Sequence, residues 1–175
     1  MGLLKIARMG HPVLFRRAEA VMDPGALVIR RLVEDMLETM EDAPGVGLAA
    51  PQVHVSLRLF VYRVPQSRAG DDTVVPPRVL INPHIEAVGD EVRLCTEGCL
   101  SIPGMRGTVP RAATVRYRGV DCDGRESSGI ASGFHANVLQ HEYDHLDGIL
   151  YPMRLLDFTS FGYVEEFAKV EGASR

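Results

Sequence analysis

Apolar residues recur every three or four positions between residues 25 and 41, and charged residues occupy most of the positions between them. The apolar positions are Ile29, Leu32, Val33, Met36, Leu37 and Met40. This spacing is typical of an amphipathic helix that rests one face on a core and leaves the other in water. Asp23 and Pro24 suit its N-cap and first helical position. We therefore expect an N-terminal amphipathic helix that serves as scaffold.

From residue 57 onward the apolar residues come in shorter runs that are rich in β-branched and aromatic side chains. These runs lie at 57–64, 79–86, 88–96, 113–120 and 125–131. They predict strands, and their short spacing along the chain predicts antiparallel sheets. The segment PQSRAGDDTVVPP at 65–77 predicts a loop, and the turn sequence Asp121-Cys122-Asp123-Gly124 separates the last two runs.

Two further helices are predicted in the last third of the chain. The first covers 133–147 and ends before Gly148, and the second is a short helix within 157–171. No repeat, low-complexity segment or linker divides the sequence, which predicts a single domain over 1–175. The order of elements indicates an α+β fold in which the 133–147 helix packs against sheet.

Composition and charge narrow the class of protein. The chain has 175 residues, 46% of them hydrophobic, and a net charge of −4 that comes from acidic and basic residues scattered along its length. This pattern offers no basic stripe for DNA or RNA. Apolar runs are far shorter than the roughly 20 residues of a membrane span, and the first residues lack a signal peptide's pattern. We therefore expect a soluble cytoplasmic protein that does not bind DNA or membranes.

The strongest chemical signal is the HExxH motif formed by residues 141 to 145 on the 133–147 helix. Its histidines, His141 and His145, are four positions apart and so share one helical face, where two imidazoles can hold one metal ion. Phe134 and Val138 lie on the same face, which indicates that this face points inward rather than presenting two exposed histidines to water.

A catalytic metal site needs a third protein ligand and an open position for water. One candidate is Cys99, and the other is Glu165 or Glu166, which follow His145 by 20 and 21 residues as in thermolysin-like peptidases. Those enzymes carry the glutamate on a long helical domain, whereas here only ten residues follow Glu165 in a strand-rich chain. Cys99 fits better, and the other two cysteines, Cys95 and Cys122, are read as small buried side chains.

Three short segments follow one another along the chain: Gly45–Gln52 (GVGLAAPQ), Glu97–Ser101 (EGCLS) and Gln140–Leu146 (QHEYDHL). Together they resemble the three signature motifs of peptide deformylases, and the intervals between them are also similar to those of that family. The resemblance covers nearly the whole chain. It implies antiparallel β-sheets packed around a central helix that carries HExxH. It also implies a metal-dependent hydrolase that removes the formyl group from the formyl-methionine of new polypeptides and releases formate.

The same resemblance assigns roles to particular residues. It implies that Cys99, His141 and His145 bind the metal, that Glu142 is the catalytic acid and base, and that Gln52 and the Leu100 backbone hold the oxyanion. It places Val46, Gly47, Gly98, Arg106, Phe134 and Val138 at the substrate. Fe(II) is the expected ion, and Zn(II), Ni(II) and Co(II) suit the same donors. The implied partners are N-formyl-methionyl nascent peptides and, near its exit tunnel, the ribosome.

Some positions extend or depart from the family pattern. Arg111, Glu97 and Asp144 are expected to form a polar network behind the metal. Asn137 stands where many relatives have arginine, and Pro51 precedes the motif glutamine. Because Asn137 lies four residues before His141, near the rim of the expected side-chain pocket, we expect this departure to affect substrate preference more than activity.

Overall fold

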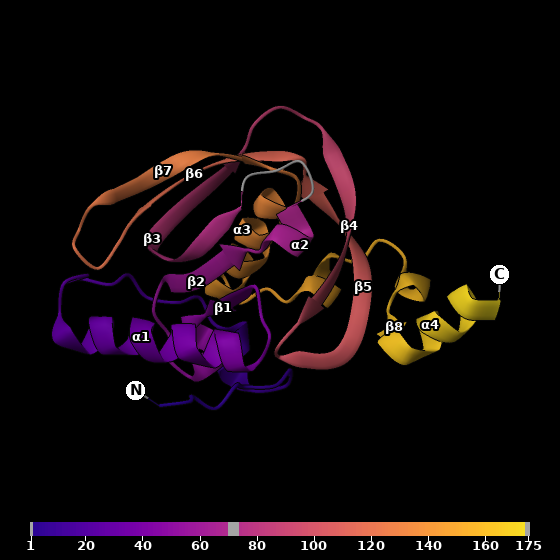
Figure 1. Cartoon of the computed structure of the whole chain (residues 1–175), viewed down its shortest axis with the longest axis horizontal. Coiled ribbons are helices and arrows are strands. Elements are labelled where there is room, and N and C mark those ends of the chain that lie inside the picture. Colours follow the sequence, from indigo (N-terminus) through magenta and orange to yellow (C-terminus); the bar gives the residue numbers. More distant parts are fainter. Residues whose placement is uncertain (1, 70–73, 174–175) are drawn as a thin grey trace.

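A computed structural model describes residues 2–69 and 74–173, in which the strands pair into two antiparallel sheets (Figure 1). The first sheet has the strand order β1-β2-β3-β6-β7 and the second the order β4-β5-β8. The strands are β1 (Gly47–Ala49), β2 (Leu59–Val64), β3 (Val75–Ala87), β4 (Val92–Cys99), β5 (Ile102–Ala112), β6 (Thr114–Val120), β7 (Glu126–Ser132) and β8 (Gly162–Tyr163). All neighbouring strands are antiparallel. The predicted α+β class with antiparallel sheets is confirmed.

In the residues that the structure describes, four α-helices and four short 3-10 helices connect and cover these strands. The α-helices are α1 (Leu27–Asp42), α2 (Gln66–Ala69), α3 (Gly133–Leu146) and α4 (Val164–Ala173), and the 3-10 helices span Pro12–Phe15, Ala50–Val53, Tyr151–Arg154 and Phe158–Ser160. α3 contacts the strands of the first sheet and β5 of the second. α4 lies at the C-terminal end of the described chain, beside β8 and away from α1 (Figure 1).

The strand β2 is buried on both faces of the first sheet. Successive side chains of a strand point to opposite faces. Phe60, Tyr62 and Val64 pack in one core cluster with residues of α3. Leu59 and Val61 pack in another, together with the apolar face of α1. The sheet therefore lies between the scaffold helix on one side and the helix with both motif histidines on the other.

A left-handed glycine fixes the end of α3. Gly148 has a φ of 73°. Its N–H donates to the His145 carbonyl at 3.3 Å, and the N–H of Ile149 donates to the Asp144 carbonyl at 2.9 Å. This pair of bonds is the Schellman arrangement, which satisfies carbonyls that the last helical turn would otherwise leave unpaired. The predicted end of this helix before Gly148 is confirmed.

The start of α1 corrects the prediction from the sequence. The helix begins at Leu27 after the N-cap Ala26, so Asp23 and Pro24 are not its cap and first residue. The Asp23 side chain instead accepts a hydrogen bond from the Gly25 N–H at 3.0 Å. Because an aspartate can close a local turn as readily as it caps a helix, the sequence signal was ambiguous.

The loop predicted at 65–77 is wrong at both ends. Gln66–Ala69 forms the helical turn α2, and Val75 already belongs to β3, while residues 70–73 lie outside the described residues. The long strand β5 was missed because glycines at 104 and 107 and prolines at 103 and 110 interrupt its apolar pattern. The helix expected within 157–171 proves to be a 3-10 turn, the short strand β8 and then α4.

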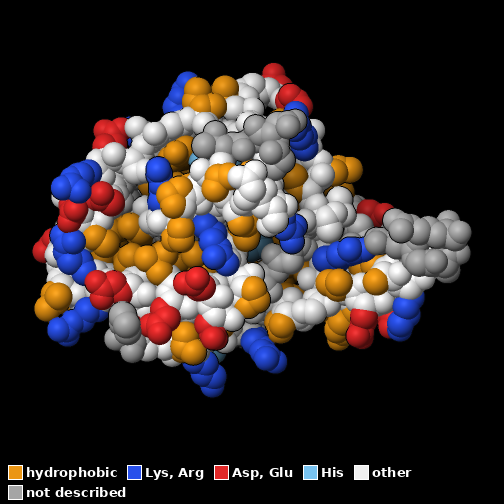
Figure 2. All heavy atoms as spheres, in the orientation of Figure 1, with side chains coloured by type: hydrophobic (Ala, Val, Ile, Leu, Met, Phe, Trp, Pro, Cys, Tyr) orange, Lys and Arg blue, Asp and Glu red, His pale blue; other side chains and the backbone are white. Residues whose placement is uncertain are grey.

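The surface agrees with the scattered charge of the sequence. Acidic and basic side chains are interspersed over the face in Figure 2 rather than gathered into a stripe of one sign. Among the helices of the described residues, none is long and apolar enough to cross a membrane.

Replacing Gly148 by alanine should destabilise the protein by about 2–4 kcal/mol. A Cβ at Gly148 would lie 2.7 Å from the Phe15 carbonyl carbon and 2.9 Å from the Arg16 nitrogen. It would also meet the steric penalty of the left-handed conformation. The free energy of unfolding from urea titration measures this loss.

Gly124 provides the matched control. Its φ is 74°, but a Cβ there would have no described atom within 4 Å. Gly124→Ala should therefore cost only about 1–2 kcal/mol, the conformational part alone. Equal losses in the two variants would show that the contact between Gly148 and the Phe15–Arg16 backbone contributes nothing.

Candidate metal centre and active site

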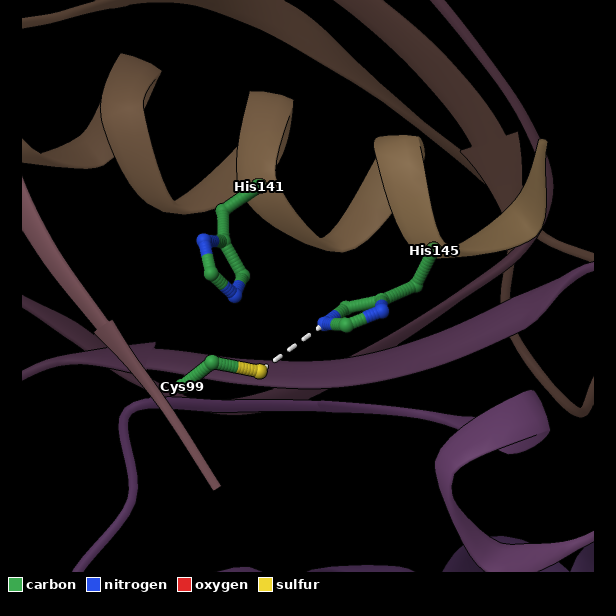
Figure 3. A group of neighbouring side chains, drawn as sticks. All are labelled: Cys99, His141 and His145. Atoms are coloured by element: carbon green, nitrogen blue, oxygen red, sulfur yellow. Dashed lines mark hydrogen bonds between the residues drawn. The ribbon is translucent and has the colours of Figure 1, made fainter. Parts of the chain in front are cut away.

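Cys99, His141 and His145 bring three metal-binding atoms together in the centre of the molecule. Their donor atoms all lie within 4.8 Å of one another. Both histidines come from α3 and Cys99 from the end of β4, and the side chains point toward a common centre (Figure 3). The Cys99 Sγ is 3.3 Å from the His145 Nε2. One thiol and two imidazoles leave a fourth position open, as in catalytic rather than structural metal sites.

The protonation of the two imidazoles fits a cation at this centre. Burial lowers the pKa of His145 well below its ordinary value, which keeps the ring in the neutral form that binds metals. Burial also acts to lower the pKa of His141, but hydrogen bonds with Cys99 and Glu97 outweigh it and raise the pKa well above the ordinary value. The surroundings of His141 thus favour a positive charge at the place where the three donors meet.

Glu97 fixes the orientation of His141. Its Oε2 lies 2.8 Å from the His141 Nδ1, so the other ring nitrogen is left to face the centre. Burial acts to raise the pKa of Glu97, but hydrogen bonds from His141 and Arg111 lower it to about 2. As a carboxylate, Glu97 accepts a hydrogen bond from the Nδ1–H and so sets the tautomer expected of a metal-binding histidine.

Behind Glu97, buried charges form the network expected from the sequence. Arg111 donates to both Glu97 oxygens at 2.7 and 2.9 Å and to Asp144 Oδ2 at 2.6 Å. Arg154 donates two hydrogen bonds of 2.5 Å to Asp144, one to each carboxylate oxygen. Glu97, Arg111 and Asp144 are buried rather than exposed. The chain of contacts joins β4, β5 and α3 behind the three donors.

Glu142 lies next to the donors, against the backbone of β1. Its side chain is buried, and burial raises its pKa to about 7. Its Oε2 has no hydrogen-bond partner among the described residues. A Cβ on Gly47 would come within 2.1 Å of Glu142 Oε1, so only glycine at position 47 leaves room for this carboxyl group. A carboxyl group with a pKa near neutrality can both accept and donate a proton.

Gln52 is held as an enclosed donor beside Cys99. Its Oε1 accepts a bond from the Ala49 N–H at 2.8 Å. Its Nε2 donates to the Ser101 hydroxyl at 3.1 Å and lies 3.5 Å from the Cys99 Sγ. The side chain is only 1% exposed, so it is not an ordinary surface amide. Leu100 follows Cys99 directly, which places its backbone beside the same group.

These residues line one cavity of about 450 Å³. The cavity wall includes most of the residues expected at the substrate: Val46, Gly47, Gly98, Leu100, Phe134 and Val138, with Gln52, Cys99, His141 and Glu142. Phe134 and Val138 also pack against the core. α3 thus contributes both the apolar residues Phe134 and Val138 and the polar residues Asn137, His141 and Glu142 to this wall.

Three residues considered from the sequence do not line this cavity: Arg106, Glu165 and Glu166. Arg106 is not among the residues that line this cavity, and its guanidinium sits 4.7 Å from the centre of the Phe167 ring. Glu165 and Glu166 are exposed on α4. Within the described ranges, the group of possible metal ligands contains Cys99 and not these glutamates, so the thermolysin-like arrangement has no support.

Two contributors had no role assigned from the sequence. Ser101 accepts the Gln52 bond, and Arg154 pairs with Asp144. Ser101 is part of the EGCLS segment, so its position beside a candidate ligand was the signal that could have identified it. Arg154 lies ten residues after Asp144, and nothing in that spacing indicates a contact.

Comparisons with known proteins match most of the chain to one family. The family model described as polypeptide deformylase matches residues 3–160. The protein named peptide deformylase 2 of Ralstonia nicotianae is 48% identical over 161 residues, which are 91% of each chain. Peptide deformylase 1 of Bordetella pertussis is also 48% identical, over 91% of this chain and 92% of its own.

Solved structures show the same fold. The Met-Ala-Ser-bound class I type b peptide deformylase of Acinetobacter baumannii superposes with a TM-score of 0.81 at 35% identity, over 88% of this chain and 99% of that one. The peptide deformylase of Thermotoga maritima gives a TM-score of 0.81 at 34% identity, over 90% and 100%. With the sequence match and the site geometry, these results show that the chain belongs to the polypeptide deformylase family, enzymes that remove the N-formyl group from nascent polypeptides.

Proposed function

We propose that the chain is a single catalytic domain in which Cys99, His141 and His145 hold one divalent metal ion at the HExxH helix α3. The observation that carries this proposal is the position of Glu142 and Gln52, which line the same cavity as Cys99 and His141. A purely structural metal site would need neither an enclosed carboxyl group nor an enclosed amide donor beside an open position.

The donor set suits several ions. We expect Fe(II) as the working metal, because the family resemblance implies it, while Zn(II), Ni(II) and Co(II) fit one thiolate and two imidazoles as well. When bound, such an ion supplies a water that loses its proton more readily and a Lewis acid for the formyl oxygen.

Glu142 is proposed to carry the proton in both steps. Its carboxylate accepts a proton from the attacking water, and the carboxylic acid then donates it to the leaving amine of methionine. Enclosure by Gly47 limits where the carboxyl group can point. One side chain therefore serves as base and then as acid.

Gln52 and Leu100 are proposed to stabilise the developing oxyanion. The Gln52 Oε1 is held by the Ala49 N–H, which directs the Nε2 toward Cys99 and Ser101. A donor fixed in this way need not reorganise when charge develops. We propose that the Leu100 backbone N–H supplies the second donor from the position next to Cys99.

The cavity wall is proposed to select the substrate. Val46, Phe134 and Val138 would line the pocket for the methionine side chain, while Gly47 and Gly98 let the peptide backbone come close. A role for Arg106 beside the peptide stays a prediction. Because formylated chains arise during translation, we propose that the enzyme meets them in the cytoplasm near the ribosome.

Glu142→Gln should lower kcat by about 10²–10⁴-fold while the metal stays bound, because it removes the proton carrier but no metal ligand. The measurement is formate release from formyl-Met-Ala-Ser by anaerobically purified, iron-loaded protein, with metal content from elemental analysis. Acetyl-Met-Ala-Ser serves as the control substrate and should not be cleaved. Full activity of the variant would remove Glu142 from the mechanism.

Gln52→Leu should lower kcat/KM by about 10²–10³-fold, the usual effect of losing one oxyanion donor. Ser101→Ala is the matched variant, because it removes the hydroxyl that accepts the Gln52 hydrogen bond but keeps the Gln52 amide. This variant should lower kcat/KM by less than about tenfold. Steady-state kinetics of both variants on formyl-Met-Ala-Ser measures the difference. A larger loss in Ser101→Ala would assign the role to the hydroxyl and not to the amide.

A further inference from the structure

Asn137 places an amide between the apolar residues Phe134 and Val138 of the cavity wall, which Arg68 also lines. It lies on α3, one turn before His141, and lines the cavity between Phe134 and Val138 in the sequence. Its side chain is 9% exposed, so more than nine-tenths of it is enclosed. The residue therefore faces the space that we propose for the first side chain of the substrate.

This amide is not fully satisfied by the protein. The Asn137 Oδ1 is enclosed, yet it accepts no hydrogen bond from any residue that the structure describes. An enclosed polar atom without a partner destabilises the folded state, whereas a leucine of similar size would pack there without this loss. An amide retained at such a position is expected to find its partner in whatever fills the cavity.

The chemistry of the amide indicates what that partner can be. An amide offers two N–H donors and a carbonyl acceptor, and a half-turn about its last bond exchanges them. The thioether sulfur of methionine is only a weak acceptor. A sulfoxide oxygen on that sulfur is a strong acceptor at nearly the same distance along the side chain, and oxidation makes methionine polar. A wholly apolar pocket would exclude such a side chain.

We propose that Asn137 is a specificity-determining residue that lets the enzyme deformylate peptides whose first residue is methionine sulfoxide as well as methionine. The Asn137 N–H donates to the sulfoxide oxygen inside the pocket. This inference rests on the proposed function, because it assumes that the first side chain enters the cavity beside α3.

The test compares formyl-Met(O)-Ala-Ser with formyl-norleucine-Ala-Ser, whose side chain has the same length but no polar atom. In the wild type, kcat/KM for each peptide is measured by formate release, and the ratio of the sulfoxide to the norleucine value is taken. In Asn137→Leu this ratio should fall at least roughly tenfold, the effect of losing one hydrogen bond in an enclosed site. A ratio cancels any general loss of activity.

Val138→Ala is the control, because it alters the volume of the same pocket without removing a polar group. Its ratio should stay within about threefold of the wild-type value. The melting temperature of Asn137→Leu should also be no lower than that of the wild type, because the Asn137 Oδ1 accepts no hydrogen bond from the described residues.

Two outcomes would overturn the inference while leaving the proposed function intact: an unchanged ratio in Asn137→Leu, or an equal fall in Val138→Ala. A wild type that cleaves neither peptide nor formyl-Met-Ala-Ser would overturn the proposed function itself, and the inference with it.

Discussion

The structure of the site depends on the buried ion pairs that join Glu97, Arg111 and Asp144. Arg111 lies between the two carboxylates, with contacts of 2.6 to 2.9 Å, and all three side chains are enclosed. Removing any one would leave an uncompensated buried charge, which is far more costly than losing an exposed pair. Since Glu97 is on β4, Arg111 on β5 and Asp144 on α3, the network fixes the hairpin of the second sheet against the histidine helix.

That attachment brings the three candidate metal ligands together. The β4–β5 hairpin carries Cys99, and the helix carries both histidines, so the distance between thiol and imidazoles follows from how hairpin and helix dock. Glu97 adds a direct contact, because its Oε2 lies 2.8 Å from the His141 Nδ1 and accepts a hydrogen bond from it. Arg154 shields the outer end of the network, where its side chain is 39% exposed. Glu97, Arg111 and Asp144 together carry one net negative charge, which the partly exposed Arg154 balances, so the charged cluster can stay enclosed behind the candidate metal site.

The sequence predicted those parts whose signal is local. Helical spacing identified α1 and α3, and the motif residues identified the three donors that the structure brings together. The strand β5 escaped prediction because Gly107 packs against Leu155, Phe161 and Tyr151, a tertiary reason for glycine that no local pattern reveals. The contact of Arg154 with Asp144 depends on how the 3-10 helix Tyr151–Arg154 packs against α3, and the place of Arg106 over Phe167 depends on how α4 packs against β5. Contacts between distant segments are what a periodic pattern cannot supply.

Two enclosed side-chain oxygens at the cavity lack a hydrogen-bond partner among the described residues, whereas the charges of the Glu97–Arg111–Asp144 network are paired. The enclosed charges of Glu97 and Arg111 are paired with each other, and such paired groups hold the fold rigid. Glu142 Oε2 and Asn137 Oδ1, by contrast, are enclosed without partners among the described residues. Each lowers stability when the cavity is empty, and each gains a partner only if water or substrate supplies one. On α3, the two oxygens without a partner among the described residues belong to residues that line the cavity, whereas the carboxylate of Asp144 is paired with Arg111 and Arg154 on the supporting side.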